Sequence, residues 1–314
     1  MRILGINISH NASICQLTNG KIDFFFEEDR FNKVKNFFPM PGNCYYKCME
    51  EYIKQRPDVI IMASIDRQMN GSTPEAVLKY NEDLKIQEVL RMWMQQPIQF
   101  VREHHHIYHA YSGFHFSNFD EAIVVVMDGG GSQLLHLFHE IESVYLMNKK
   151  ECERKFVHAT DLHHAVSYNY IPLKEDKMFS LDGTDIILSG RPSMGNLYTS
   201  MCKDLKEEIN NVVGVSPGAE AGKLMGYACY PEHKDAYDLQ EYAREYTIDF
   251  LKMAMKYNPS CKNIVLSGGY ALNCTNNYHY VKEFPDYNFF VDPVPHDGGT
   301  SIGAALWLDH DHKR

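Results

Sequence analysis

The sequence has no stretch of eighteen consecutive apolar residues and no run rich in proline, glycine and serine. The first absence argues against a membrane-spanning helix, and the second argues against a disordered chain. Residues 1–13 also lack the basic region and the small-residue cleavage site of a signal peptide. We therefore expect a globular protein that stays in the cytoplasm, and its 314 residues are enough for one large domain or two lobes.

The sequence also lacks a cysteine spacing typical of zinc sites, and it has no net positive charge. The eight cysteines fall at irregular spacings, and the close pair Cys44 and Cys48 has no second pair that would complete a zinc site. We interpret the cysteines as reduced structural thiols. The net charge of -10 argues against a surface that binds a nucleic acid duplex non-specifically, although it is compatible with a local basic patch.

Strand patterns recur in two similar units along the chain. The first unit has strand-like segments at residues 2–7, 14–18 and 21–26, and the second has them at residues 122–127, 134–138 and 144–147. Asn19 and Gly20 predict a hairpin turn in the first unit, and the glycine-rich segment 128–131 follows the first strand of the second. Internal repetition with such turns is typical of actin-like ATPases, which place two phosphate-binding loops on either side of a cleft.

The repeat predicts an α/β protein with two lobes, residues 1–120 and 121–314. Further expected elements are a buried parallel strand at 58–64, a segment at 99–102 that leads into a helix from about residue 105, a helix at 237–256, strands at 263–266 and 287–291, and a closing helix at 298–308. Residues 149–220 show little periodicity, and we interpret them as an insertion that shapes a substrate pocket.

His105 and His109 are the strongest pair of potential metal ligands. They are four residues apart, so on a helix both imidazoles project from the same face and can bind one metal ion. A third ligand must then come from elsewhere in the chain. The alternative is a histidine-rich helix surface or one satisfied core histidine, and the spacing alone favours neither reading.

Two aspartates end apolar strands and precede glycines. Asp297 precedes two glycines at the start of a helix, where it is either an ordinary helix N-cap or a ligand. Asp128 precedes three glycines, whose backbone N–H groups can contact phosphates while the carboxylate faces a cation. The alternative for Asp128 is a glycine-rich hairpin turn, although three glycines exceed what a hairpin needs.

Two later segments extend the expected nucleotide contacts. Residues 267–273 repeat the order of strand and glycine turn, and we expect them to contact the adenosine part of the nucleotide. Asn273 would then form a hydrogen bond with the ribose or the base. Lys223 follows a glycine and would touch a phosphate, although the segment lacks the frame of a P-loop. The predicted nucleotide contacts are Gly129, Gly130, Gly131, Lys223, Gly268, Gly269 and Asn273.

His10 and the charged segment 28–35 have weaker patterns. His10 lies on the turn after the first strand, where an imidazole can take a proton from an attacking hydroxyl, although a single histidine in a turn is more often polar surface. The cations of residues 28–35, which include Lys35, either neutralise an anionic substrate or belong to a solvated helix face.

The order of these motifs is more specific than any one of them. Along the chain they read GINISHNAS, EEDRFNKVK, HHHIYHAYSGF, VVVMDGGG, GKLMGYA, LSGGYALN and DPVPHDGGTSIGAA. This order resembles the O-carbamoyltransferase family, whose members carbamoylate nodulation factors, cephamycins and aminoglycosides. The resemblance covers nearly all of the chain except residues 149–215. It implies an actin-like ATPase fold of the ASKHA class, related to the tRNA threonylcarbamoyl-transferring proteins.

The resemblance also implies a metal site. His105, His109 and Asp297 match the positions that hold a metal on the nucleotide phosphates of ATP or ADP in this family. Asp128 is expected as a further ligand. Imidazole and carboxylate ligands together suit iron, manganese or zinc, and magnesium is a further candidate.

In such enzymes carbamoyl phosphate and ATP give a carbamoyl-adenylate, and an acceptor hydroxyl attacks its carbonyl while AMP leaves. By resemblance, His10 is the general base and Lys35 is a catalytic cation. Full-length members carry a C-terminal domain of the YrdC type that makes the adenylate, and this chain does not include one. We therefore expect either a separate YrdC-like adenylating protein or direct use of carbamoyl phosphate.

The chain looks like short phage forms, which would act in the host cytoplasm. For such forms the expected acceptor is the hydroxymethyl group of 5-hydroxymethylcytosine in DNA, and a sugar or antibiotic hydroxyl is the main alternative. Two other readings stay open. One is a subunit similar to tRNA threonylcarbamoyl-adenosine transferases, and the other is a non-catalytic nucleotide-binding scaffold.

Overall fold

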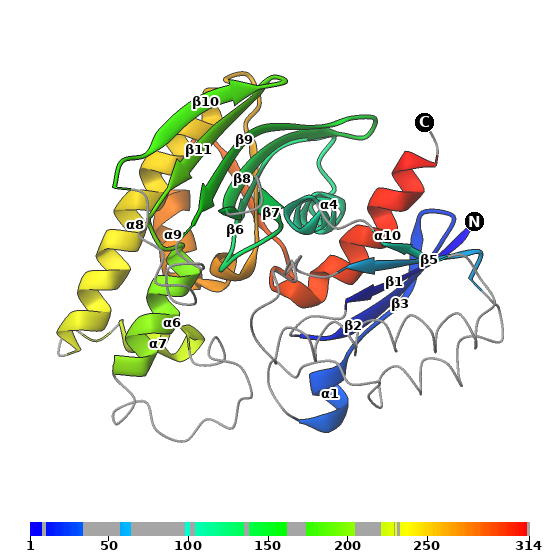
Figure 1. The fold of residues 1–314 in the computed structure, drawn as a ribbon, viewed down its shortest axis with the longest axis horizontal. Helices are drawn as coiled ribbons and strands as arrows, with labels where there is room; N and C mark the ends of the chain where they lie inside the picture. Colours follow the sequence, from blue (N-terminus) through cyan, green and yellow to red (C-terminus); the bar gives the residue numbers. More distant parts are fainter. Residues whose placement is uncertain are drawn as a thin grey trace.

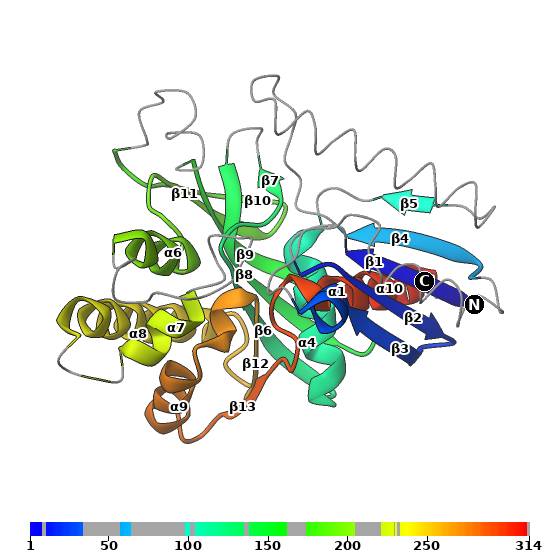
Figure 2. The ribbon, with the colours of Figure 1, turned by 90° about the horizontal axis from the view of Figure 1, so that it is seen from below.

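In the computed structural model, two mixed β-sheets flank a central pair of helices, α4 (His105–Ser117) and α10 (Thr300–Asp311), as Figure 1 and Figure 2 show. The structure describes residues 1–7, 11–33, 57–63, 98–100, 104–134, 138–161, 174–204, 221–228, 230 and 233–312. Among these residues, no helix is both long and apolar enough to cross a membrane.

The smaller sheet comes from the N-terminal part of the chain. It contains β1 (Arg2–Asn7), β2 (Ser13–Thr18), β3 (Lys21–Glu27), β4 (Val59–Ala63) and β5 (Ile98–Phe100), in the order β3-β2-β1-β4-β5. β1 pairs antiparallel with β2 and parallel with β4. Asn19 and Gly20 have φ angles of 50° and 81°, as the tight turn of a two-residue hairpin requires. These pairings confirm the predicted hairpin and the predicted parallel strand.

The larger sheet has eight strands. They are β6 (Glu121–Met127), β7 (Gln133–Leu134), β8 (Phe138–Asn148), β9 (Cys152–Thr160), β10 (Lys177–Leu181), β11 (Thr184–Ser189), β12 (Asn263–Ser267) and β13 (Asn288–Val291). The order is β10-β11-β9-β8-β6-β12-β13, and β7 pairs with β8 outside this path. β12 runs parallel to both β6 and β13, which brings the carboxyl ends of these three strands to one edge.

The second meander differs from its prediction. The strand expected at 144–147 is present but belongs to the longer strand β8, which begins at Phe138, and the third strand of the meander is β9. Most of the strand expected at 134–138 lies outside the described residues. Glu140 and Glu142 interrupt the apolar pattern of β8, yet both are buried. Their partners are Arg154 and His158 on β9, so polar residues of this strand face the protein interior. Residues 149–220 therefore begin with a strand of the sheet itself.

Helices cover both faces of the larger sheet. One face carries α6 (Met194–Asp204), α7 (Ala221–Tyr227), α8 (Lys234–Met255) and α9 (Cys274–Glu283), whose apolar residues pack on β6 and β12. The other face packs on α4. Shorter elements are α1 (Glu28–Asn32) and two 3-10 helices, η2 (Gly269–Leu272) and η3 (Asp297–Gly299). The helices predicted from residue 105, at 237–256 and at the C-terminal segment are confirmed.

Helices α4 and α10 cross unusually closely between the sheets. At Gly303 on α10, an added Cβ would lie 1.7 Å from the backbone oxygen of Tyr108 on α4. α10 packs on β1, β2 and β4 as well, so it joins the smaller sheet although it follows the larger sheet in sequence. The lobe limits at residues 120 and 121 stay a prediction. The close crossing holds the first turn of α10 beside the first turns of α4.

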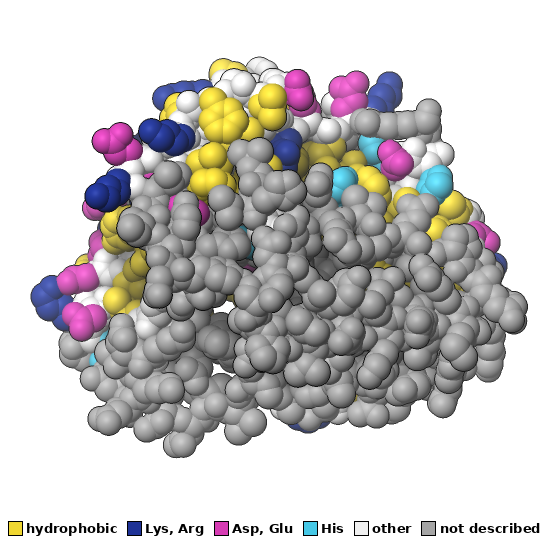
Figure 3. Space-filling model, in the orientation of Figure 1, with side chains coloured by type: hydrophobic (Ala, Val, Ile, Leu, Met, Phe, Trp, Pro, Cys, Tyr) yellow, Lys and Arg dark blue, Asp and Glu magenta, His cyan; other side chains and the backbone are white. Residues whose placement is uncertain are grey.

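The outer edge of the larger sheet exposes apolar side chains. β10 leaves Met178, Phe179 and Leu181 exposed, and Figure 3 shows hydrophobic side chains on the surface above this sheet. β10 pairs with β11 on one side and has no described strand on the other. Among the described strands, β10 is therefore an edge strand of the sheet, and its exposed side chains do not contribute to the core.

Candidate metal centre

The first turn of α4 presents both histidines of the predicted pair to the protein interior. α4 begins at His105, and the backbone N–H of His105 donates to Ser132 Oγ at 3.0 Å. Such a partner is needed because the first amides of a helix have no acceptor within the helix. His105 and His109 lie one turn apart, and both side chains are fully buried. The helix predicted to carry these ligands is confirmed.

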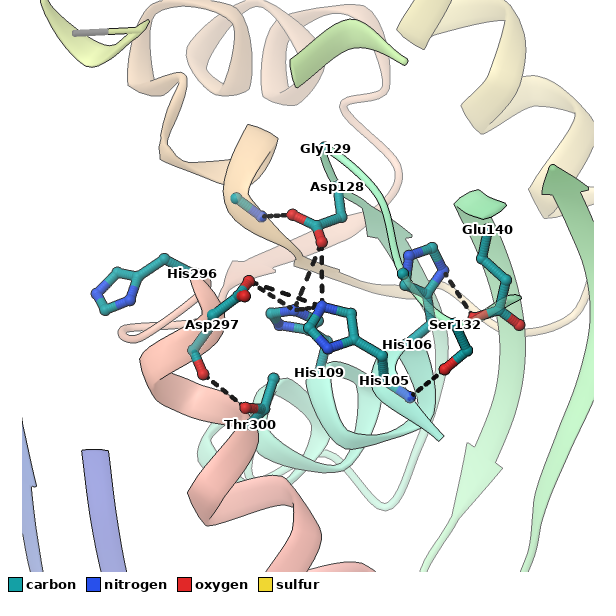
Figure 4. Close-up of polar contacts among 12 residues, drawn as sticks. His105, His106, His109, Asp128, Gly129, Ser132, Glu140, His296, Asp297 and Thr300 are labelled. Carbon is teal, nitrogen blue, oxygen red and sulfur yellow. Dashed lines mark hydrogen bonds and ion pairs between the residues drawn. The ribbon is translucent and has the colours of Figure 1, made fainter. Parts of the chain in front are cut away.

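Two carboxylates from distant segments face these imidazoles. His105 Nε2 lies 3.2 Å from His109 Nε2, 3.2 Å from Asp128 Oδ2 and 3.6 Å from Asp297 Oδ1. His109 Nε2 lies 4.0 Å from Asp128 Oδ2 and 3.8 Å from Asp297 Oδ1. Figure 4 shows the four side chains pointing toward one another. The structure thus brings together all four residues of the predicted metal site.

The geometry and the donor types fit a metal ion. One donor atom from each of the four residues lies within 4.8 Å of the others. Zn²⁺ binds imidazole nitrogen at about 2.0 Å, which places tetrahedral ligand atoms about 3.3 Å apart. The observed separations are close to that value. Two nitrogen and two oxygen donors suit iron, manganese or zinc better than calcium, which takes oxygen ligands.

Charges within the cluster change the pKa values of its members. Burial acts to lower the pKa of His105, but the carboxylates of Asp297 and Asp128 outweigh it and raise that pKa. Burial likewise acts to raise the pKa of Asp128, but the hydrogen bond from His105 and the nearby His109 hold it well below its usual range. The cluster therefore keeps the Asp128 carboxylate charged and attracts a positive charge, either a proton on His105 or a metal ion.

A glycine turn fixes the position of Asp128. Asp128 follows β6, and its Oδ1 accepts a hydrogen bond from the backbone N–H of Gly269 at 3.1 Å. Gly268 has a φ of 88°, and a Cβ there would lie 2.2 Å from the backbone oxygen of Met127. Only glycine allows this approach. The predicted nucleotide contacts at Gly268 and Gly269 stay predictions, and the structure gives the turn a second role in holding a metal-site carboxylate.

The loop after Asp128 is held from two sides. The backbone oxygen of Gly129 accepts hydrogen bonds from Ser193 Oγ at 2.8 Å and from Asn196 Nδ2 at 3.0 Å. On the other side, a Cβ at Gly131 would lie 2.5 Å from Cδ2 of His106. The glycine loop therefore packs between the start of α6 and α4. This is the segment that the sequence predicts to contact phosphates.

Asp297 is not a helix N-cap, so the simpler interpretation of its position is wrong. The N-cap of η3 is His296, whose Nδ1 accepts a hydrogen bond from the backbone N–H of Gly298 at 3.1 Å. Thr300 Oγ1 donates to the backbone oxygen of Asp297 at 2.6 Å. From β2, Ser13 Oγ donates to the backbone oxygen of Gly298 at 2.7 Å. These bonds leave the Asp297 carboxylate facing the histidines.

Three further residues near the cluster were not identified from the sequence. His106 is buried behind the glycine loop with its Nδ1 2.8 Å from Ser143 Oγ, and burial lowers its pKa well below the usual value. Glu27 of β3 lies 3.2 Å from His296 Nε2, and its pKa is raised by burial and by Asp29. The sequence features that could have indicated them are the three consecutive histidines at the start of α4, for His106, and the first residue of the EEDRF motif, for Glu27.

The other predicted site residues divide into two groups. His10 and Lys35 lie outside the described residues, as does the side chain of Lys223, which belongs to α7. The prediction that Asn273 contacts the ribose or base stays a prediction. Its side chain is buried, accepts from Gln240 Nε2 and from the backbone N–H of Asn276, and donates to Tyr198. Asn273 therefore caps α9 within the core.

The chain is similar to known proteins over part or most of its length. Residues 240–306 match the family model described as the carbamoyltransferase N-terminus. Over 321 residues the chain is 27% identical to the uncharacterized protein MJ1051 of Methanocaldococcus jannaschii, covering 97% of this chain and 56% of that protein. It is 23% identical over 321 residues to the nodulation protein NolNO of Sinorhizobium fredii, covering 96% of this chain and 46% of that protein. The chain thus spans about half the length of these curated relatives.

Two solved structures share the fold. Full-length HypF in its phosphate- and nucleotide-bound form superposes with a TM-score of 0.53 at 13% identity, covering 98% of this chain and 55% of that chain. A ROK family protein from Streptococcus pneumoniae in complex with sucrose gives 0.51 at 14% identity, with both chains covered completely. These likenesses confirm the predicted actin-like ATPase (ASKHA) fold class. The family-model match over residues 240–306 and the alignment with NolNO agree with the resemblance to the O-carbamoyltransferase family, and HypF shares the fold.

Proposed function

We propose that this chain is the metal- and nucleotide-binding part of an O-carbamoyltransferase. The reaction moves a carbamoyl group from carbamoyl phosphate, through a carbamoyl-adenylate made with ATP, to an acceptor hydroxyl. The observation that carries this proposal is the buried cluster of His105, His109, Asp128 and Asp297 beside the glycine loop. Two strand ends and two helix starts meet there, at the edge where α/β sheets bind ligands.

The surroundings of the cluster suit phosphate binding. The Asp128 carboxylate is fixed by Gly269, and the loop that follows it is held by Ser193 and by His106. A loop held in this way can offer its backbone N–H groups to phosphate oxygens without reordering. A bound divalent metal supplies positive charge that neutralises the phosphates and stabilises departing AMP. The cluster then positions the donor.

The chemistry at the acceptor needs a base. The acceptor oxygen forms a bond to the carbamoyl carbon, the bond from that carbon to the adenylate oxygen breaks, and AMP leaves with the electron pair. The proton of the hydroxyl goes to His10, and Lys35 balances the charge of the anionic donor. Both assignments rest on the resemblance of the motifs around these residues.

The proposed acceptor is the hydroxymethyl group of 5-hydroxymethylcytosine in DNA. The support for it is the resemblance to short phage forms, and a sugar or antibiotic hydroxyl is the second acceptor class. A separate YrdC-like protein is the proposed source of carbamoyl-adenylate. Such a partner would be dispensable if this chain used carbamoyl phosphate directly.

The test uses carbamoyl phosphate carrying a labelled carbamoyl carbon, with and without ATP and a YrdC-like protein. Acceptors are DNA with 5-hydroxymethylcytosine, unmodified DNA, amino sugars and tRNA. We expect label in a hydroxylated acceptor, lost in His105→Ala and in His10→Asn but retained in His115→Ala. His115 is the matched control because it lies on α4 with an exposed side chain, away from the cluster. Label in tRNA alone, or in no acceptor, would overturn the proposal.

A further inference from the structure

A cavity lies between α6, α8 and His158 of β9. It has a volume of about 560 Å³, which is within the size range of small-molecule sites. Its walls are two helical stripes, Met194, Leu197 and Met201 on α6 and Leu239, Tyr242 and Tyr246 on α8. Each stripe repeats at intervals of three and four residues, so each lies along one face of its helix. The walls are mainly apolar and partly aromatic.

The floor of the cavity is a closed hydrogen-bond network. Ser189 Oγ accepts from the backbone N–H of Arg191 at 3.3 Å, so its own proton points to His158 Nε2 at 2.7 Å. His158 Nδ1 then donates to Glu142 Oε2 at 2.8 Å, and Tyr246 donates to the same oxygen at 2.5 Å. Ser189 is fully buried, so it is not an accessible nucleophile. The network instead fixes the Tyr246 ring and the segment that carries Arg191.

The charges along the cavity are arranged by sign. Arg191 lies close enough to Tyr246 to affect its pKa. Asp235 and Asp238 line the cavity from the first turns of α8. Asp235 is eleven residues from Tyr246, which is about 16 Å along a helix. The end of the cavity that carries Arg191 therefore favours an anionic group, and the end that carries Asp235 and Asp238 disfavours one.

The guanidinium of Arg191 is only weakly committed to another partner. It pairs with Asp176 at 3.0 Å, and both side chains are nearly half exposed. An ion pair between such exposed side chains contributes little to stability. Replacing Asp176 by a ligand carboxylate as the partner of Arg191 therefore costs little free energy. We propose that this cavity binds a planar aromatic acid, with its ring between the α6 and α8 stripes and its acid group on Arg191.

Helix α6 connects this cavity to the metal cluster. Met194 and Leu197 face the cavity, whereas Ser193 and Asn196 donate to the backbone oxygen of Gly129. A Cβ at Gly195 would lie 2.9 Å from the Cα of Gly129, so the helix and the loop are in tight contact. A ligand that fills the cavity constrains α6 and through it the residue next to Asp128. Occupation of the cavity therefore changes metal affinity.

Binding is tested by calorimetry with 2-naphthoate, and with naphthalene-2-methanol as the uncharged match. We expect the acid to bind about tenfold more tightly than the alcohol, as one charge-assisted hydrogen-bonded pair predicts. Arg191→Gln should remove this preference, and Tyr242→Ala should weaken both ligands. Tyr237→Ala is the matched control, because Tyr237 is also exposed on α8 but does not line the cavity. Absence of binding, or equal affinities in Arg191→Gln and the unchanged protein, would overturn the assignment.

The connection through α6 has its own readout. Mn²⁺ affinity is measured with and without saturating 2-naphthoate, and we expect a change of about fivefold or more. Asn196→Ala should keep 2-naphthoate binding but reduce this change, because it removes one bond to Gly129. Equal Mn²⁺ affinity in the two conditions would overturn the connection. None of these measurements requires carbamoyl transfer. The binding of 2-naphthoate is independent of the proposed function, whereas the Mn²⁺ readout rests on the proposed metal site.

Discussion

Gly303 is the position at which helix packing and the metal cluster are perturbed together. In Gly303→Ala the new Cβ would lie 1.7 Å from the backbone oxygen of Tyr108. Close carbon–oxygen contacts in proteins are about 3.3 Å, so α10 must move about 1.5 Å away from α4. Overpacking of this kind costs about 3 kcal/mol, and the better helix propensity of alanine returns about 1 kcal/mol. We expect the free energy of unfolding to fall by about 2 kcal/mol.

The same displacement separates the metal ligands. Asp297 Oδ1 lies 3.6 Å from His105 Nε2 and 3.8 Å from His109 Nε2. A further 1.5 Å or so would leave it about 5 Å from both imidazoles, outside the 4.8 Å within which all four donor atoms now lie. Mn²⁺ affinity should then fall about tenfold or more, as it does when the supports of metal ligands are removed.

Two measurements check this prediction, urea unfolding for stability and calorimetry for Mn²⁺. Gly226→Ala on α7 is the control, because a Cβ there meets nothing within 4 Å. It should leave Mn²⁺ binding unchanged and stability equal or slightly higher. If Gly303→Ala kept both the stability and the Mn²⁺ affinity of the unchanged protein, the crossing of α4 and α10 would not be what positions Asp297.

Three more predictions concern the cluster and its surroundings. In a thermal-shift series Mn²⁺ should stabilise the protein and the His115→Ala variant, and it should stabilise His109→Ala much less. For metal-free protein refolded in EDTA, the raised pKa of His105 gives stability that is present below pH 6.5 and lost as the pH rises through the folded-state pKa. The melting temperature of His105→Gln should lack this fall, and a fall of the same size in that variant would contradict the assignment. Asn273→Ala should lower the free energy of unfolding by about 2 kcal/mol, because it removes the acceptor of the buried Gln240 Nε2 and the side-chain cap of α9, while ADP affinity by calorimetry stays unchanged.

The four residues of the predicted metal site could be identified from the sequence because the patterns that indicate them are local. His105 and His109 are one helical turn apart, so a helix alone makes them neighbours. Asp128 directly follows an apolar strand and Asp297 lies six residues after one, each before glycines, and strand ends meet at one edge of an α/β sheet. What the sequence could not resolve was whether Asp297 caps a helix. That depended on the His296 side chain, which occupies the capping position instead.

What the sequence could not show depends on contacts between distant residues. Buried Glu140 and Glu142 interrupt the apolar pattern of β8, and their partners on β9 cannot be recognised before the pairing of the strands is known. Asn273 follows a glycine turn, as a nucleotide ligand would, but its side chain bonds to Gln240 and Tyr198, 33 and 75 residues away. A polar residue in a motif can serve either a ligand or the core, and only the tertiary structure distinguishes the two.

The burial of the metal cluster has a consequence for exchange kinetics. All four of its side chains are at most 7% exposed. If the site holds an ion, we expect that ion to leave, and a chelator to reach it, when the elements around the cluster open locally. Metal release is then limited by the rate of opening rather than by the affinity of the ligands. A protein that acquires its metal during folding should therefore retain it through dialysis against EDTA, and should release it at the rate at which its amides exchange with solvent.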